Sequence, residues 1–207
     1  MIHTYIHTYI HHTFFHTQKY DIFNDEPAVC FRNTAGRYEV ALKSGGQWSR
    51  STVVEHASAG VHCEINVLNS QLVTAYTQGR DLHFATRQAN GNWSIQTADA
   101  QIRSLGREAD LVVHGGEPII AHRDFTRGQL RVTRRSNGQW RSVATLPQNG
   151  EFGFRPAIHV DDNGLRVFHG TVPDEIDQSG DGTQWYAYGP LAAESYQQFN
   201  FDSLSAG

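Results

Sequence analysis

One position recurs along the chain with a side chain that can form directional hydrogen bonds. It holds Tyr76, His122 and His169, each near the end of a short apolar segment. Tyrosine and histidine offer an aromatic face and a polar edge, which suits the binding of a sugar or a peptide. The same side chains also pack between the layers of a β protein with the polar atom hydrogen-bonded. Both interpretations of this position are open.

Charged residues follow the same position in two of the segments. Arg123 and Asp124 come directly after His122, and Arg32 stands at the matching place in an earlier segment. A guanidinium beside a carboxylate gives the directional hydrogen bonds that a carbohydrate or anion site needs. The alternative is an ion pair within the segment, which would contribute about 0–1 kcal/mol at the surface. The candidate ligand-binding residues are Tyr76, His122, Arg123, Asp124, His169 and Arg32.

A short acidic stretch resembles the first half of a calcium-binding loop. Asp177, Ser179 and Asp181 place oxygen atoms at positions 1, 3 and 5, and Gly182 stands at position 6. Position 12 is Tyr188 instead of the glutamate of an EF-hand, which excludes that motif. We therefore expect no more than weak Ca²⁺ binding by this stretch.

The spacing of the tryptophans predicts the scaffold that positions these residues. Trp48, Trp93 and Trp140 follow turn residues at intervals of roughly 45 residues, the range of a four-stranded propeller blade. Apolar residues alternate with polar ones around them, as half-buried strands require. The pattern predicts an all-β chain, a β-propeller built from about four four-stranded repeats. We expect the three tryptophans to pack between sheets, with stacking on sugar rings as the alternative.

The two ends of the repeat region differ. Residues 1–20 repeat the unit Ile-His-Thr-Tyr, which predicts a disordered low-complexity tail. The β-propeller is expected over residues 21–207. The first unit has no clear opening strand, so we expect three strands there and an array that is incomplete at its N-terminus. The expected units span about 22–56, 57–103, 104–148 and 152–202.

Composition excludes several classes of protein. The 207 residues carry a formal net charge of −4, which gives no reason to expect nucleic acid as a partner. Arginines cluster locally, and we expect them to lie on the solvated side of strands; they are Arg131, Arg134, Arg135 and Arg141. No run approaches the length of a membrane span. No signal peptide is visible, and both a secreted and a cytoplasmic protein fit the sequence.

Cys30 and Cys63 are the two cysteines of the chain, and no Cys-x-x-Cys motif occurs. We expect two buried free thiols that act as small apolar side chains. A disulfide between neighbouring units is the alternative.

The repeats resemble those of the sialidase-like, BNR-like superfamily of β-propellers over residues from about 26 to 202. The resemblance lies in units such as Glu117-Pro-Ile-Ile-Ala-His-Arg-Asp124, in a Leu-x-x-Ala-x-Arg strand such as Leu82-His-Phe-Ala-Thr-Arg87, and in Gly-x-Trp. Ser179-Gly-Asp-Gly-Thr-Gln-Trp185 is one residue short of the superfamily's Asp-box, and Phe154-Arg-Pro156 approaches its arginine motif. The resemblance therefore implies the fold and the repeat, and it does not extend to a complete set of sialidase residues.

Function is predicted from the repetition of polar strand ends without one unique catalytic set. We expect a non-catalytic, lectin-like recognition module that binds carbohydrate or glycoprotein through loops at the rim of the propeller. A sialidase-like glycoside hydrolase or lyase, or an inactive relative, is one alternative. A scaffold for protein partners is the other.

Overall fold

The computed structural model describes residues 19–55, 62–100, 109–145, 154–161, 164–170, 185–188 and 196–199. These residues form four antiparallel sheets of four strands each, and in every sheet the strands pair in chain order. The predicted all-β class is therefore confirmed. Sheets I to IV are named here in chain order.

Sheet I contains β1 (Lys19–Phe23), β2 (Glu26–Arg32), β3 (Tyr38–Ser44) and β4 (Gln47–Val54). Sheet II contains β5 (Cys63–Leu68), β6 (Gln71–Gln78), β7 (Asp81–Arg87) and β8 (Trp93–Asp99). Sheet III contains β9 (Ala109–His114), β10 (Glu117–Asp124), β11 (Gln129–Ser136) and β12 (Gln139–Thr145). Sheet IV contains β13 (Phe154–Asp161), β14 (Gly164–Gly170), β15 (Trp185–Tyr188) and β16 (Tyr196–Phe199).

The first sheet has four strands, so the expectation of three was wrong. β1 pairs with β2 from Lys19 opposite Cys30 to Phe23 opposite Glu26. This strand was hard to recognise because it is short and most of its side chains are exposed. Ile22 and Phe23 are its clearly apolar residues. Its side chains therefore lack the strong alternation that marks a half-buried strand.

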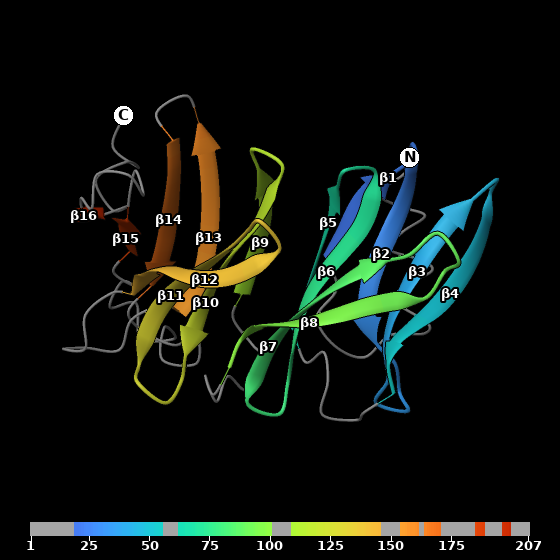
Figure 1. Cartoon of the computed structure of the whole chain (residues 1–207), viewed down its shortest axis with the longest axis horizontal. Coiled ribbons are helices and arrows are strands. Elements are labelled where there is room, and N and C mark those ends of the chain that lie inside the picture. Colours follow the sequence, from blue (N-terminus) through green and yellow to red (C-terminus); the bar gives the residue numbers. More distant parts are fainter. Residues whose placement is uncertain are drawn as a thin grey trace, which may run out of the picture.

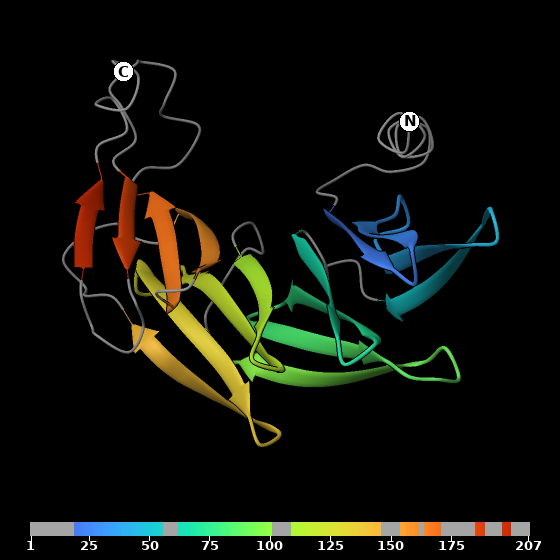
Figure 2. The same ribbon diagram turned by 90° about the horizontal axis from the view of Figure 1, so that it is seen from above.

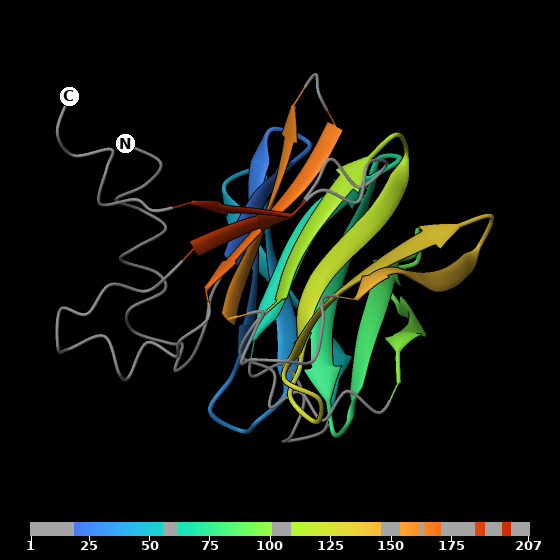
Figure 3. The same ribbon diagram turned by 90° about the vertical axis from the view of Figure 1, so that its left-hand side faces the viewer.

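The four sheets follow one another along an arc, with sheet I and sheet IV at opposite ends (Figures 1 and 2). The first strand of each of sheets I to III lies on the concave side and the fourth on the convex side (Figure 2). Figure 3 looks along the row from the side of sheet IV and shows the sheets as twisted layers placed face to face. Each inner sheet therefore buries both of its faces against neighbours, which is why its second strand is apolar on both sides.

Three hydrophobic clusters fill the spaces between consecutive sheets. We call these spaces the first junction (sheets I and II), the second junction (II and III) and the third junction (III and IV). Val40 and Leu72 lie in the first cluster, Phe84 and Ile120 in the second, and the third includes Val132 and Val167 of sheets III and IV. Burying one such side chain fully contributes about 1.5–3 kcal/mol, so the junctions hold the arc together.

Trp93 and Trp140 lie between sheets, as predicted. The Trp93 indole N–H donates to Ser51 Oγ on β4, at 3.2 Å. The Trp140 indole N–H donates to Gln96 Oε1 on β8, at 3.3 Å, and its ring meets Phe84 edge-on with centroids 5.1 Å apart. Each of these two side chains thus joins its own sheet to the preceding one.

The two cysteines form a disulfide, so the expectation of free thiols was wrong. Cys30 on β2 and Cys63 on β5 are both fully buried, and their Cα atoms lie 6.2 Å apart. That separation is in the range of disulfides. The bond crosses the first junction, which is therefore closed by a covalent bond as well as by apolar packing.

Candidate functional site

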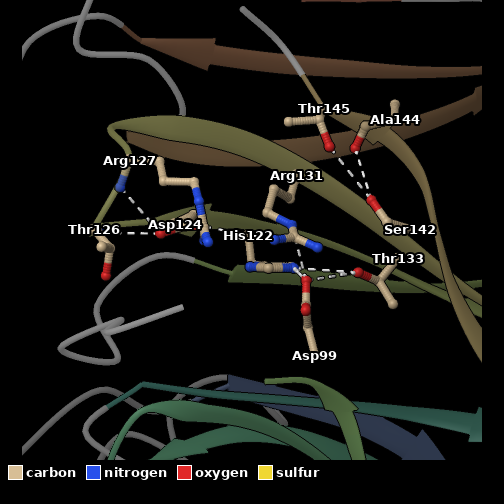
Figure 4. Close-up of polar contacts among 10 residues, drawn as sticks. All are labelled: Asp99, His122, Asp124, Thr126, Arg127, Arg131, Thr133, Ser142, Ala144 and Thr145. Atoms are coloured by element: carbon tan, nitrogen blue, oxygen red, sulfur yellow. Dashed lines mark hydrogen bonds and ion pairs between the residues drawn. The ribbon is translucent and has the colours of Figure 1, made fainter. Parts of the chain in front are cut away.

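A cluster of charged and polar side chains lies at one end of the second junction (Figure 4). Asp99 ends β8 of sheet II, and the other members belong to sheet III. His122 on β10 lies opposite Arg131 on β11 in the strand register, and Thr133 follows two residues later on the same face. Period-two alternation thus turns these three side chains toward sheet II.

A β-bulge directs Asp99 toward sheet III. The pairing of β7 with β8 shifts between Leu82, which lies opposite Asp99, and His83, which lies opposite Thr97. The extra residue bends and twists the strand locally, and bulges often redirect a side chain in this way.

One oxygen of Asp99 is shared by several side chains of sheet III. His122 Nε2 lies 3.2 Å and Arg131 Nε 3.0 Å from Asp99 Oδ2. The Thr133 hydroxyl donates to the same oxygen at 3.5 Å and lies 3.2 Å from His122 Nε2. The Arg131 N–H is not well aimed at Asp99, so this contact is an ion pair without good hydrogen-bond geometry.

Asp124 organises the adjacent β10–β11 hairpin. Its Oδ1 accepts the backbone N–H groups of Thr126 and Arg127, at 2.9 and 3.2 Å. Its Oδ2 accepts from Arg127 Nη1 at 2.7 Å and lies 3.6 Å from Arg131 Nη1. Asp124 is fully buried, whereas half of the Arg127 side chain is exposed. The cluster therefore runs from a buried carboxylate to an accessible guanidinium.

The internal contacts of the cluster do not satisfy all of its polar atoms. His122 Nδ1 and Arg131 Nε are buried atoms that make no hydrogen bond among the described residues. The side chains of Asp99 and Arg131 are 12% and 19% exposed, so a solute can reach their edges. A carboxylate oxygen beside guanidinium N–H groups fits a ligand whose own groups donate and accept, as hydroxyl groups do.

The corresponding part of the first junction is aromatic. The Tyr76 ring lies on His83 with centroids 5.4 Å apart and on Tyr38 with centroids 4.7 Å apart. Burial raises the pKa of Tyr76 to about 12 and the pKa of Tyr38 further, and it lowers the pKa of His83. The Tyr38 and Thr74 hydroxyls are hydrogen-bonded to each other. Burial therefore disfavours the charged forms of these three side chains.

The predicted site residues do not come together in one place. His122 and Asp124 lie in the cluster of the second junction, while Tyr76 faces the first junction. The Arg123 guanidinium lies 4.2 Å from the centroid of the Phe125 ring, on the opposite face of β10 from its two neighbours. The remaining two candidates are distant in the chain: His169 is buried on β14, and Arg32, which is partly buried, ends β2.

The cluster contains residues that the sequence did not indicate, above all Asp99, Arg131 and Thr133. Arg131 was expected on a solvated face, but it is mostly buried and paired with two carboxylates. The position of Arg131 beside His122 follows from the strand register, because β10 and β11 form a hairpin in which these two residues are paired. Asp99 carries no comparable signal, because its contact depends on how sheet II packs on sheet III.

The calcium stretch Asp177, Ser179 and Asp181 lies outside the described residues, as do all five histidines of the N-terminal repeat. Within the described segments no group of three His, Cys, Asp or Glu side chains gathers closely enough to hold a metal ion. The same segments contain no helix with the length and hydropathy that a membrane span needs.

Comparison with solved structures identifies the architecture. The Aleuria aurantia lectin, a six-bladed β-propeller described with its mode of fucose recognition, matches with a TM-score of 0.57 and 12% identity over 93% of this chain and 64% of its own. AofleA from Arthrobotrys oligospora matches with a TM-score of 0.56 and 15% identity over 91% and 56%. GH43B of the Bacteroides ovatus xyloglucan locus matches with a TM-score of 0.55 and 10% identity over 90% and 41%.

These similarities show the fold: the chain has β-propeller architecture. The chain spans less than two thirds of the length of each of the three structures. No protein-family model and no curated protein matches the sequence.

Proposed function

We propose that the chain is a lectin-like carbohydrate-binding module and that its binding site is the cluster of the second junction. The observation that carries this proposal is the shared arrangement of Asp99, His122 and Arg131 between two sheets. Two sheets contribute to it, and the side chains of Asp99 and Arg131 are partly exposed at its edge.

The chemistry of the cluster favours neutral, hydroxyl-rich ligands. A hydroxyl can donate to Asp99 Oδ1 and accept from Arg131, and vicinal hydroxyls on a sugar ring present both functions a few ångströms apart. Two arginines face two aspartates here, so the charges of these four side chains balance. An anionic ligand would have to compete with carboxylates that already hold both guanidinium groups.

The comparisons supply the first sugar to test. The solved structures of the Aleuria aurantia lectin include its N224Q mutant in complex with α-methyl-L-fucoside. We propose a fucose-type monosaccharide, alone or at the end of a glycoprotein glycan, as the ligand. The further proposals that the described sheets are four blades and that the chain is related to the BNR-like superfamily rest on the repeat spacing and the sheet order.

A glycoside hydrolase is the second candidate, and one observation favours it. Asp99 and Asp124 lie in the same cluster, both in contact with Arg131, and paired carboxylates are what glycoside hydrolysis needs. Turnover of aryl glycosides that is lost in Asp124→Asn would favour the hydrolase over the lectin.

The test of the lectin proposal is calorimetric titration with a panel of methyl glycosides, including methyl α-L-fucoside. Arg131→Lys keeps the charge but removes the planar fork of donors, so we expect binding to weaken at least tenfold. Arg134→Lys is the matched control, because Arg134 lies on the same strand but pairs with Glu117 on the other face of the sheet. Equal affinities for wild type and Arg131→Lys would contradict the site, and no binding to any glycoside would contradict the function.

A further inference from the structure

The first and second junctions use equivalent positions in different ways. In sheet I Val54 lies opposite Tyr38, and in sheet II Asp99 lies opposite Leu82; in both sheets the register shifts at the very next pair. Val54 and Asp99 are therefore equivalent residues at the end of the fourth strand. The shared bulge directs each of them toward the following sheet.

The receiving sheets also match position by position. Tyr76 lies opposite His83 in sheet II, and His122 lies opposite Arg131 in sheet III. The second junction thus combines Asp99 with His122 and Arg131. The first junction combines Val54 with Tyr76 and His83 at the same three places.

At those places the first junction has no charged pair: the Tyr76 hydroxyl and His83 Nδ1 are buried and make no hydrogen bond among the described residues. Val54 is partly buried and packs against the apolar cluster of that junction, and Tyr76 is 1% exposed under the stacked His83 ring. The disulfide lies beside this stack, because Cys63 is the residue opposite Tyr76 in the strand register. Opening a path for a solute would require separating two sheets that a covalent bond joins.

We propose that Asp99 is the residue that determines which junction binds, and that the first junction is a closed structural joint with no ligand site. This inference rests on the proposed function and deepens it, because it assigns binding to one junction and names the position that distinguishes the two. A sugar at the second junction would contact both sheets. Asp99 of sheet II would then decide whether the sugar binds, and not only the repeat position that holds Tyr76, His122 and His169.

The test compares substitutions at equivalent positions of the two junctions, with methyl α-L-fucoside as the titrated probe. Asp99→Asn keeps the shape of the side chain and removes the charged acceptor. We expect the dissociation constant to rise 10- to 100-fold, as for the loss of one hydrogen bond to a charged group. Asp99→Glu keeps the charge and moves it by one methylene, so this variant should also bind the sugar more weakly. It provides the test if Asp99→Asn does not fold. Two control variants are His83→Gln, which alters the first junction, and Glu55→Gln, which alters the residue after Val54. Each should change the affinity for methyl α-L-fucoside less than twofold.

The outcomes separate this inference from the function on which it rests. If wild type binds and both Asp99 variants bind equally well, or if His83→Gln weakens binding tenfold, the inference is wrong while the lectin proposal stands. If wild type binds no sugar of the panel, the proposed function fails and this inference fails with it. Melting temperatures of all variants, measured in parallel, show whether each one is folded.

Discussion

The first and second junctions join the same kinds of strands, and an ion pair crosses each of them, between Lys19 and Glu64 at the first. They differ at the end where Tyr76 and His122 lie. At the first junction a disulfide, a Tyr38–Tyr76–His83 stack and apolar side chains exclude water. At the second, an apolar cluster is extended by ion pairs that centre on Asp99 and Arg131. Both junctions therefore contain an apolar cluster between their sheets. The side chains at one end of the junction differ in type between the two.

The difference teaches where function can be placed in such a scaffold. Burial of charge is unfavourable unless every partner is present, so a polar cluster is a poor way to join two sheets. The first junction shows that aromatic and covalent closure is available to the same fold. Under the proposed function, the charged cluster of the second junction serves ligand binding rather than stability.

Removing the disulfide should have the largest effect on this comparison. The double variant Cys30→Ala/Cys63→Ala releases a loop of 33 residues, for which the chain-entropy model gives a loss of about 3–4 kcal/mol in the free energy of unfolding. Urea unfolding measures the loss, and hydrogen exchange should locate it in β2 and β5. Wild type in reductant is the control and should lose a similar amount. Unchanged stability in both would show that the first junction does not depend on the bond.

Removing Arg131 should have the next largest effect. Arg131→Leu leaves the carboxylates of Asp99 and Asp124 without this guanidinium, and we expect a loss of about 2–3 kcal/mol in the free energy of unfolding. Arg134→Leu on the same strand breaks a half-exposed pair with Glu117 and should lose less than about 1 kcal/mol. Equal losses in urea unfolding of the two variants would contradict the buried character of the cluster.

Alkaline pH should weaken the first junction selectively. The pKa of Tyr76 rises to about 12 because burial disfavours the phenolate, while an unfolded tyrosine ionises near pH 10. The stability that this group contributes is complete below pH 10 and is lost as the pH rises toward 12. Urea midpoints should therefore fall between pH 9 and pH 11 in wild type and fall less in Tyr38→Phe/Tyr76→Phe. Parallel curves for the two proteins would exclude these tyrosines as the cause.

Removing the Tyr76 hydroxyl alone should have the smallest effect. This oxygen is buried and makes no hydrogen bond within the described residues, so Tyr76→Phe should change the free energy of unfolding by less than about 1 kcal/mol and in the stabilising direction. His122→Phe is the equivalent change at the second junction and removes the contact with Asp99. It should be the more destabilising of the two, and the reverse order would contradict the comparison.

Much of the architecture was predictable from local patterns. The tryptophan spacing and the strand alternation predicted the four repeated sheets, and the packing role of Trp93 and Trp140 followed from their repetition. β1 was underestimated because an edge strand with exposed side chains has little alternation. The disulfide was not the preferred prediction because the two cysteines are 33 residues apart in sequence. Whether they meet depends on how closely two sheets approach each other.

The site was predictable only in part, for a related reason. His122 and Asp124 stood out because residue type and repeat position are visible in the sequence. Arg131 lies on the adjacent strand of the same hairpin, and its partner across the junction, Asp99, is defined by a bulge at the end of β8. Contacts between sheets depend on register, twist and packing together, and none of these can be read from one repeat alone.

The most direct test of the central claim is a crystal structure of the protein with methyl α-L-fucoside at saturating concentration. The account predicts electron density for the sugar at the second junction, with ring hydroxyls within hydrogen-bond distance of Asp99 and Arg131. It also predicts no sugar at the first junction beside Tyr76 and His83. Density for the sugar at the first junction, or at saturation none beside Asp99, would contradict it.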